Sequence, residues 1–125
     1  PRAQASWTAA TPLCLARHCL SAVVAHEMLF AIGGRDDNGQ GMTSIEVLHS
    51  QTGTWSRLTD LAIERHSSAA VSFHDGLIVI LGGRDSDHGV LSSVEVFDVH
   101  GGCWRERGFF PDMLAQRSGL AAAAL

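Results

Sequence analysis

The segment LFAIGGRDDNG, residues 29–39, places tandem glycines directly before charged and amide side chains, as in a loop that binds an anion. The apolar run ends on Gly33 and Gly34, and four polar residues follow it: Arg35, Asp36, Asp37 and Asn38. A phosphate-binding loop needs a helix after the glycines, so that its first amide groups face the anion. The residues that follow here, MTSIEVL, are typical of a strand, which argues against a nucleotide site.

Metal ligands are present but poorly spaced. Cys14, His18 and Cys19 lie close together, yet they form no CxxC pair and no second half-site accompanies them, so small semi-buried thiols are the favoured interpretation. Calcium could in principle be bound by the carboxylates of Asp36, Asp37, Asp85 and Asp87. Their spacing does not supply the six or more oxygen ligands of an EF-hand-type loop. We predict no metal and no cofactor.

The seven histidines do not indicate catalysis, because none is paired with a nucleophilic serine or cysteine in a supportable geometry. His26, His74, His49 and His100 fall in or next to expected hairpin turns. His18 and His66 each follow an arginine, which suggests one repeated position.

The overall composition fits an ordinary globular chain: 125 residues, 46% hydrophobic and 18% charged. A net charge of −4 gives no general reason to expect nucleic acid or an anionic membrane as partner, and no stretch approaches the roughly 20 apolar residues of a membrane span. Three cysteines and no convincing signal peptide favour a reducing, cytoplasmic location. The missing initiator Met suggests a fragment or a processed chain.

An internal repeat organises the chain. RHCLSAVVAHEMLFAIGGRDD (17–37) aligns with RHSSAAVSFHDGLIVILGGRDS (65–86), and SIEVLHSQTGTW (44–55) aligns with SVEVFDVHGGCW (93–104). Gly82-Gly83 follows Gly33-Gly34 by 49 residues, as Trp104 follows Trp55. RSGLAAAAL (117–125) begins a third copy, and Trp7 is placed as the tail of an earlier one.

Each copy contains four short apolar runs, which predict strands. They span about 19–25, 28–33, 44–49 and 54–58 in the first copy, and about 67–73, 77–82, 93–98 and 103–107 in the second. Asp75-Gly76 and Thr52-Gly53 are good hairpin turns, whereas His26-Glu27 lacks glycine and should be strained or differently turned. No helix is predicted, because the repeat overrules the helix propensity of LAAAAL.

Four antiparallel strands in about 50 residues make a small sheet that cannot bury both faces alone. Stacking such sheets radially as the blades of a propeller solves this problem. The tandem glycines would let backbones approach closely, and the tryptophan of the outer strand would fill the gap between blades.

The glycine pairs with Trp55 and Trp104 resemble the diagnostic pattern of Kelch repeats, and the two segments ending in tryptophan resemble those of Kelch-like substrate adaptors. The family often has an aromatic residue near Leu48 and Phe97; Phe97 fits and Leu48 departs. The resemblance implies an all-β propeller fragment with two complete blades and partial strands at both ends. We divide the chain into 1–16 (end of a preceding blade and linker), 17–58 and 59–107 (Kelch blades), and 108–125 (linker and first strand of a following blade).

Two blades cannot close a ring, since propellers typically have 4–8 blades. We therefore expect further blades of the same parent chain, six or so by family resemblance, and association or aggregation of the isolated chain.

Charged residues recur at equivalent positions. Arg17, Arg65 and Arg117 open the inner strands, while Glu46 and Glu95 lie in the third strands. A buried Arg–Glu pair is the favoured interpretation. An arginine grip on an acidic motif of a partner is the alternative.

Loops 35–43 and 84–92 should share one face with the connections 59–66 and 108–118, and loops on a rigid scaffold often bind partners. The predicted protein-binding residues are Arg35, Asp36, Asp37, Asn38, His66, Ser67, Arg84, Asp85, Asp87 and His88. In the Kelch-like adaptors that the chain resembles, this face captures a substrate peptide for ubiquitination, although no BTB or BACK segment is present in this stretch.

An enzyme is the second hypothesis, because Kelch propellers also occur in copper radical oxidases and sialic-acid epimerases. The oxidases need a tyrosine ligand, and this chain has no tyrosine; the epimerase interpretation rests on fold analogy. A cytoskeletal or structural repeat is a third possibility. We predict a non-enzymatic interaction module.

Overall fold

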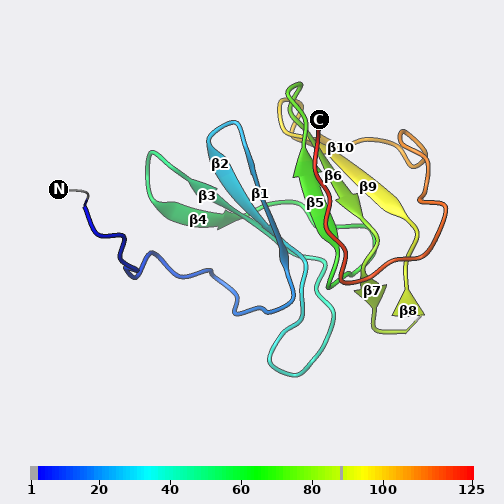
Figure 1. Cartoon of the computed structure of the whole chain (residues 1–125), viewed down its shortest axis with the longest axis horizontal. Helices are drawn as coiled ribbons and strands as arrows, with labels where there is room; N and C mark the ends of the chain where they lie inside the picture. The colour runs from blue at the N-terminus through cyan, green and yellow to red at the C-terminus, as the bar shows by residue number, and fades with distance from the viewer. Residues whose placement is uncertain (1–2, 88) are drawn as a thin grey trace.

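The computed structural model describes residues 3–87 and 89–125 and contains two four-stranded antiparallel sheets side by side (Figure 1). The first sheet, blade one, has the order β1 (Ser21–Ala25), β2 (Met28–Ile32), β3 (Ile45–His49), β4 (Thr54–Arg57). The second, blade two, consists of β5 (Ala69–Ser72), β6 (Leu77–Leu81), β9 (Val94–Asp98) and β10 (Cys103–Trp104), again paired in chain order.

A two-stranded hairpin, β7 (Arg84–Asp85) with β8 (Gly89–Val90), lies in the connection between β6 and β9. The described residues contain no helix, and therefore none that could cross a membrane. The predicted all-β fold of two blades is confirmed.

The inner strands begin two residues later than predicted, at Ser21 and Ala69. Just before each start, Cys19 has φ of 54° and Ser67 has φ of 53°, values in the left-handed region that interrupts a strand. Gly119 has φ of 63° at the corresponding place in the third copy. A left-handed residue at the entrance to the inner strand is therefore part of the repeat.

β10 is shorter than the predicted run 103–107. The amide of Arg105 still donates to the Val96 carbonyl at 2.8 Å, but the Phe109 amide then donates to the Glu106 carbonyl, which closes a turn. Gly108, with φ of 88°, allows the chain to leave β9 there.

The partial strands expected at the two ends are not formed. Residues 3–20 and 105–125 contain no strand. The Gly119 amide nevertheless donates to the Ser67 carbonyl, as the Ser67 amide does to the Cys19 carbonyl. Residues 120–125 follow, at the positions that align with the inner strands of the two blades. They occupy the inner-strand position without the neighbouring second strand that a ladder requires.

The tandem glycines fit their sites for two reasons. Gly33 and Gly82 both have φ of 59°, and a Cβ on Gly33 would lie 2.3 Å from the backbone oxygen of Arg65. A Cβ on Gly82 would lie 2.5 Å from the backbone oxygen of Arg117. Each pair therefore provides both a left-handed turn and a close approach to the segment that opens the next copy.

Two apolar clusters form the core. The larger one lies between the blades and joins Phe30, Ile32 and Val47 of blade one to Ile78 and Ile80 of blade two, all nearly inaccessible to solvent. Trp104 packs against this cluster, with its ring 5.1 Å from that of Phe97 in an edge-to-face contact. The blades thus bury each other's faces, as the propeller interpretation requires.

The second cluster covers the other face of blade two and contains Leu77, Val79, Val94 and Val96, with Met113 packed against them. Met113 comes from the segment that leads into the third copy. This segment begins to cover the face on which a third blade would stack.

The β1–β2 turn generates a first prediction. His26 and Glu27 have φ of 49° and 61°, so both residues adopt left-handed conformations in a two-residue turn that favours Asn-Gly. Glu27→Gly should raise the free energy of unfolding by about 0.5–1 kcal/mol, because glycine relieves more strain than its extra freedom in the unfolded chain costs. Urea denaturation measures the change, and a lower midpoint would contradict it.

The tandem glycines generate a second prediction. Gly33→Ala should cost about 3 kcal/mol, because it adds a clash with the Arg65 carbonyl to the strain of a left-handed alanine. Gly53 is the matched control: its φ is 66°, but nothing lies within 4 Å of an added Cβ. Gly53→Ala should cost only about 1 kcal/mol. Equal losses of stability in urea would show that close approach plays no part.

Candidate functional site

Below the loop face, each blade holds a buried arginine that binds its own third strand. Arg17 donates to the carbonyls of Gly33 (2.9 Å) and Ser44 (2.8 Å), and to the Glu46 carboxylate at 2.6 Å. Arg65 repeats this set in blade two. Both arginine side chains have no solvent exposure.

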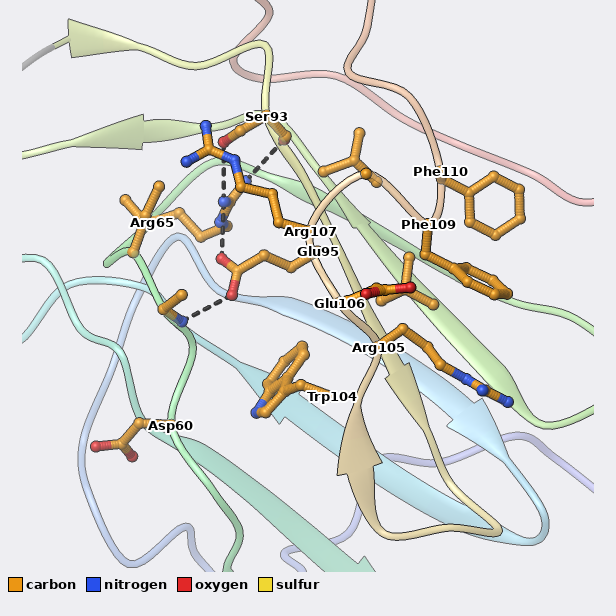
Figure 2. A pocket seen from close by; sticks show the side chains of 15 residues that line it. Asp60, Arg65, Ser93, Glu95, Trp104, Arg105, Glu106, Arg107, Phe109 and Phe110 are labelled. Carbon is orange, nitrogen blue, oxygen red and sulfur yellow. Dashed lines mark hydrogen bonds and ion pairs between the residues drawn. The ribbon is translucent and has the colours of Figure 1, made fainter.

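Arg65 donates to the carbonyls of Gly82 (2.8 Å) and Ser93 (3.1 Å) and to the Glu95 carboxylate at 2.8 Å; Figure 2 shows the contacts with Ser93 and Glu95. The other oxygen of Glu95 accepts the amide of Ala62 at 2.7 Å. Both predicted Arg–Glu pairs are therefore present. The alternative role of these two arginines, gripping a partner, is wrong, because their guanidinium groups are enclosed.

Glu46 is held as a carboxylate. Burial alone would raise its pKa, but the amide of Cys14, at 2.6 Å, and the Arg17 guanidinium outweigh this effect and place the pKa below its ordinary value. The ionised pair therefore persists at neutral pH and fixes the segment that precedes blade one.

The loop after β2 is shaped by its own side chains. Arg35 forms an antiparallel bridge with His18 through hydrogen bonds of 2.9 and 3.0 Å, and its Nε donates to the Gly39 carbonyl. Asp36 Oδ1 accepts the amides of Asn38 and Gln40, each at 2.9 Å. This leaves the side chains of Asp37 and Asn38 exposed at the tip.

The loop after β6 repeats this construction. Arg84 bridges to His66, as Arg35 does to His18, and Asp85 Oδ1 accepts the Asp87 amide at 3.1 Å. Asp85 is buried, with 7% exposure, whereas Arg84 and Asp87 are exposed. Of the predicted contacts, His88 lies outside the described residues.

The two loops lie at one end of the blades, opposite the hairpin turns (Figure 1), and they are linked to each other. The Gly41 amide donates to Ser86 Oγ at 3.1 Å, and the Ser86 amide donates to Glu64 Oε1 at 3.0 Å. None of these three residues is among the contacts predicted from the sequence. The one sequence signal for these contacts is that Glu64 falls in the connection 59–66, which is predicted to lie on this face.

His66, which bridges to Arg84 on the loop face, is 8% exposed. Its Nδ1 is 3.1 Å from the hydroxyl of the neighbouring Ser67. Burial, and next the positive charges of Arg35 and Arg84, lower the pKa of His66, so the imidazole is neutral at pH 7. Ser67 itself is partly buried and in the left-handed conformation.

The structure thus brings the described predicted residues together but divides them by exposure. Those with exposed side chains are Asp37, Asn38, Arg84 and Asp87. Arg35, Asp36 and Ser67 are partly buried, and His66 and Asp85 are buried. A partner that approaches this face would meet the first group directly, with the second group supporting the loops.

Comparison with known families gives one clear match. The model of the Kelch motif matches residues 16–62 and again residues 65–107, which together make up most of the chain. A search of curated proteins finds no match.

The lowered pKa of His66 generates a third prediction. The unfolded chain takes up a proton near pH 6.5, whereas the folded His66 takes it up at lower pH, so stability should fall as the pH drops below about 6.5. His66→Gln should reduce this loss between pH 7 and 5, as measured by urea denaturation at each pH. The exposed His74 provides the matched control, and a His74→Gln variant should keep the wild-type slope. The same slope in all three proteins would contradict the assignment.

Proposed function

Because the chain belongs to the Kelch-repeat family, we propose that its loop face binds a peptide segment of a partner protein. Two equivalent loops, one from each blade, are joined there by the contacts of Ser86 with Gly41 and Glu64. This linkage supports the proposal best, since it makes a preorganised surface from two separate loops, and binding to such a surface costs little ordering entropy.

The charges of this face favour a partner segment that carries carboxylates. Asp36 and Asp85 direct their carboxylates to amides of their own loops, whereas the Arg84 side chain is exposed. Arg84 can therefore make bidentate hydrogen bonds to a carboxylate of the partner. The exposed Asp37 and Asp87 lie nearby and would select against a uniformly acidic partner by repulsion.

A more specific role, substrate recognition within a ubiquitin ligase adaptor, is also proposed. Its support is the resemblance of residues 44–55 and 93–104 to the blades of Kelch-like adaptors. Three free, exposed thiols support a reducing intracellular location; they belong to Cys14, Cys19 and Cys103. A BTB segment encoded upstream in the full reading frame would support the adaptor role, and a secretory signal there would contradict it.

A fourth prediction tests the loop face. Peptides selected from a random peptide library displayed on phage against the 125-residue chain should include acidic residues, and Arg84→Ala should weaken their binding about tenfold or more. His74→Ala, on a hairpin turn at the opposite end, is the matched control and should leave the affinity unchanged. Fluorescence polarisation of labelled peptides measures both. Equal affinities for Arg84→Ala and wild type would refute this site.

A further inference from the structure

A cavity of about 480 Å³ lies at the outer edge of blade two, between Trp104, the loop that carries Phe109 and residues 60–63 of the connection between the blades. Figure 2 shows the residues around it, which include the Arg65–Glu95 pair, the Trp104 indole and the loop that carries Phe109 and Phe110. Its volume falls within the roughly 300–1,000 Å³ of typical ligand pockets. The early end of β10 opens this cavity, because residues 106–110 turn away from β9 after the last hydrogen bond between the two strands, from the Arg105 amide to the Val96 carbonyl.

Blade one shows how the chain fills the corresponding place. There the Leu58 amide continues the outer strand and donates to the Ile45 carbonyl at 2.9 Å. The indole nitrogen of Trp55 donates to the Thr11 carbonyl at 3.0 Å. In blade one, therefore, an amide of the chain donates to the edge of β3, and a carbonyl of the chain accepts from the indole of the neighbouring tryptophan.

Blade two leaves both of these positions open. No described amide takes the place of Leu58 on the carbonyl of Val94, which is equivalent to Ile45. The indole nitrogen of Trp104 is buried and has no hydrogen-bond partner among the described residues. A buried N–H without an acceptor is costly and uncommon. Trp104 is one of the residues that line the cavity.

We propose that this cavity binds an extended peptide segment of a partner protein, which adds to the free edge of β9 as a short strand. The two open positions require a hydrogen-bond donor for the Val94 carbonyl and a hydrogen-bond acceptor for the Trp104 indole. An extended backbone supplies both groups, whereas a carboxylate or phosphate supplies acceptors alone.

Apolar side chains of the segment fit the same cavity. Phe109 and Phe110 line it and remain 46% and 36% exposed, which is high for phenylalanine. The alternate side chains of a bound strand would pack on these rings and on Trp104. This site does not depend on the loop face, so either proposal can fail without the other.

The test uses the ¹⁵N-labelled 125-residue chain, whose three tryptophans each give one indole cross-peak in the NMR spectrum. The probe is the capped tripeptide acetyl-valyl-leucyl-valinamide. Titration should shift the cross-peaks of the Trp104 indole and the Arg105 and Val96 amides saturably. Shifts confined to the loop face, or no saturable shift at millimolar probe, would overturn the proposal.

Two variants separate binding at this cavity from general effects. Trp104→Phe removes the indole donor and should weaken probe binding about fivefold. Trp55→Phe makes the same change where the indole already has an acceptor, and should leave the affinity unchanged. If Trp104→Phe does not fold, Phe110→Ala takes its place with the same expectation. Equal losses of probe affinity in Trp104→Phe and Trp55→Phe would contradict a peptide site. The same cross-peak shifts on titration with sodium benzoate would also contradict it.

Discussion

The structure depends on a buried guanidinium that joins three segments in each blade. The Arg65 side chain holds the end of β6 and the start of β9 through the Gly82 and Ser93 carbonyls and Glu95. Its backbone carbonyl accepts the Gly34 amide of blade one at 2.9 Å. One residue therefore closes its own blade and attaches that blade to the previous one. Removing one partner of such a buried pair typically costs 3–5 kcal/mol, because the other charge stays buried without compensation.

The same joint sets the geometry of the loop face. The tandem glycines turn the chain sharply where it meets the next arginine, so the loop after β2 emerges beside the entrance of β5. The repeat then places a second loop in the same orientation. Binding surface and scaffold are thus connected, since the hydrogen bonds that stack the blades also align the loops.

Much of this could be read from the sequence, because the repeat supplies an internal alignment. The glycine pairs, the Arg–Glu pairs and most strand limits followed from equivalent positions. Features in which the copies differ did not follow. The turn at Gly108 shortens β10, and the burial of Asp85 and His66 depends on contacts between loops that are remote in sequence. Alignment of two copies predicts what they share, whereas the open cavity arises where they diverge.

Native-state hydrogen exchange of an Arg65→Met variant tests the joint most directly. If Arg65 couples the blades, the amides of Gly34 and Ile32 in blade one should lose protection together with that of Ile80 in blade two, each by about 10²–10³-fold. Arg57→Met, which removes only an exposed ion pair with Asp60, should leave all three unchanged. Loss of protection confined to blade two would contradict the account, because Arg65 would then stabilise its own blade alone.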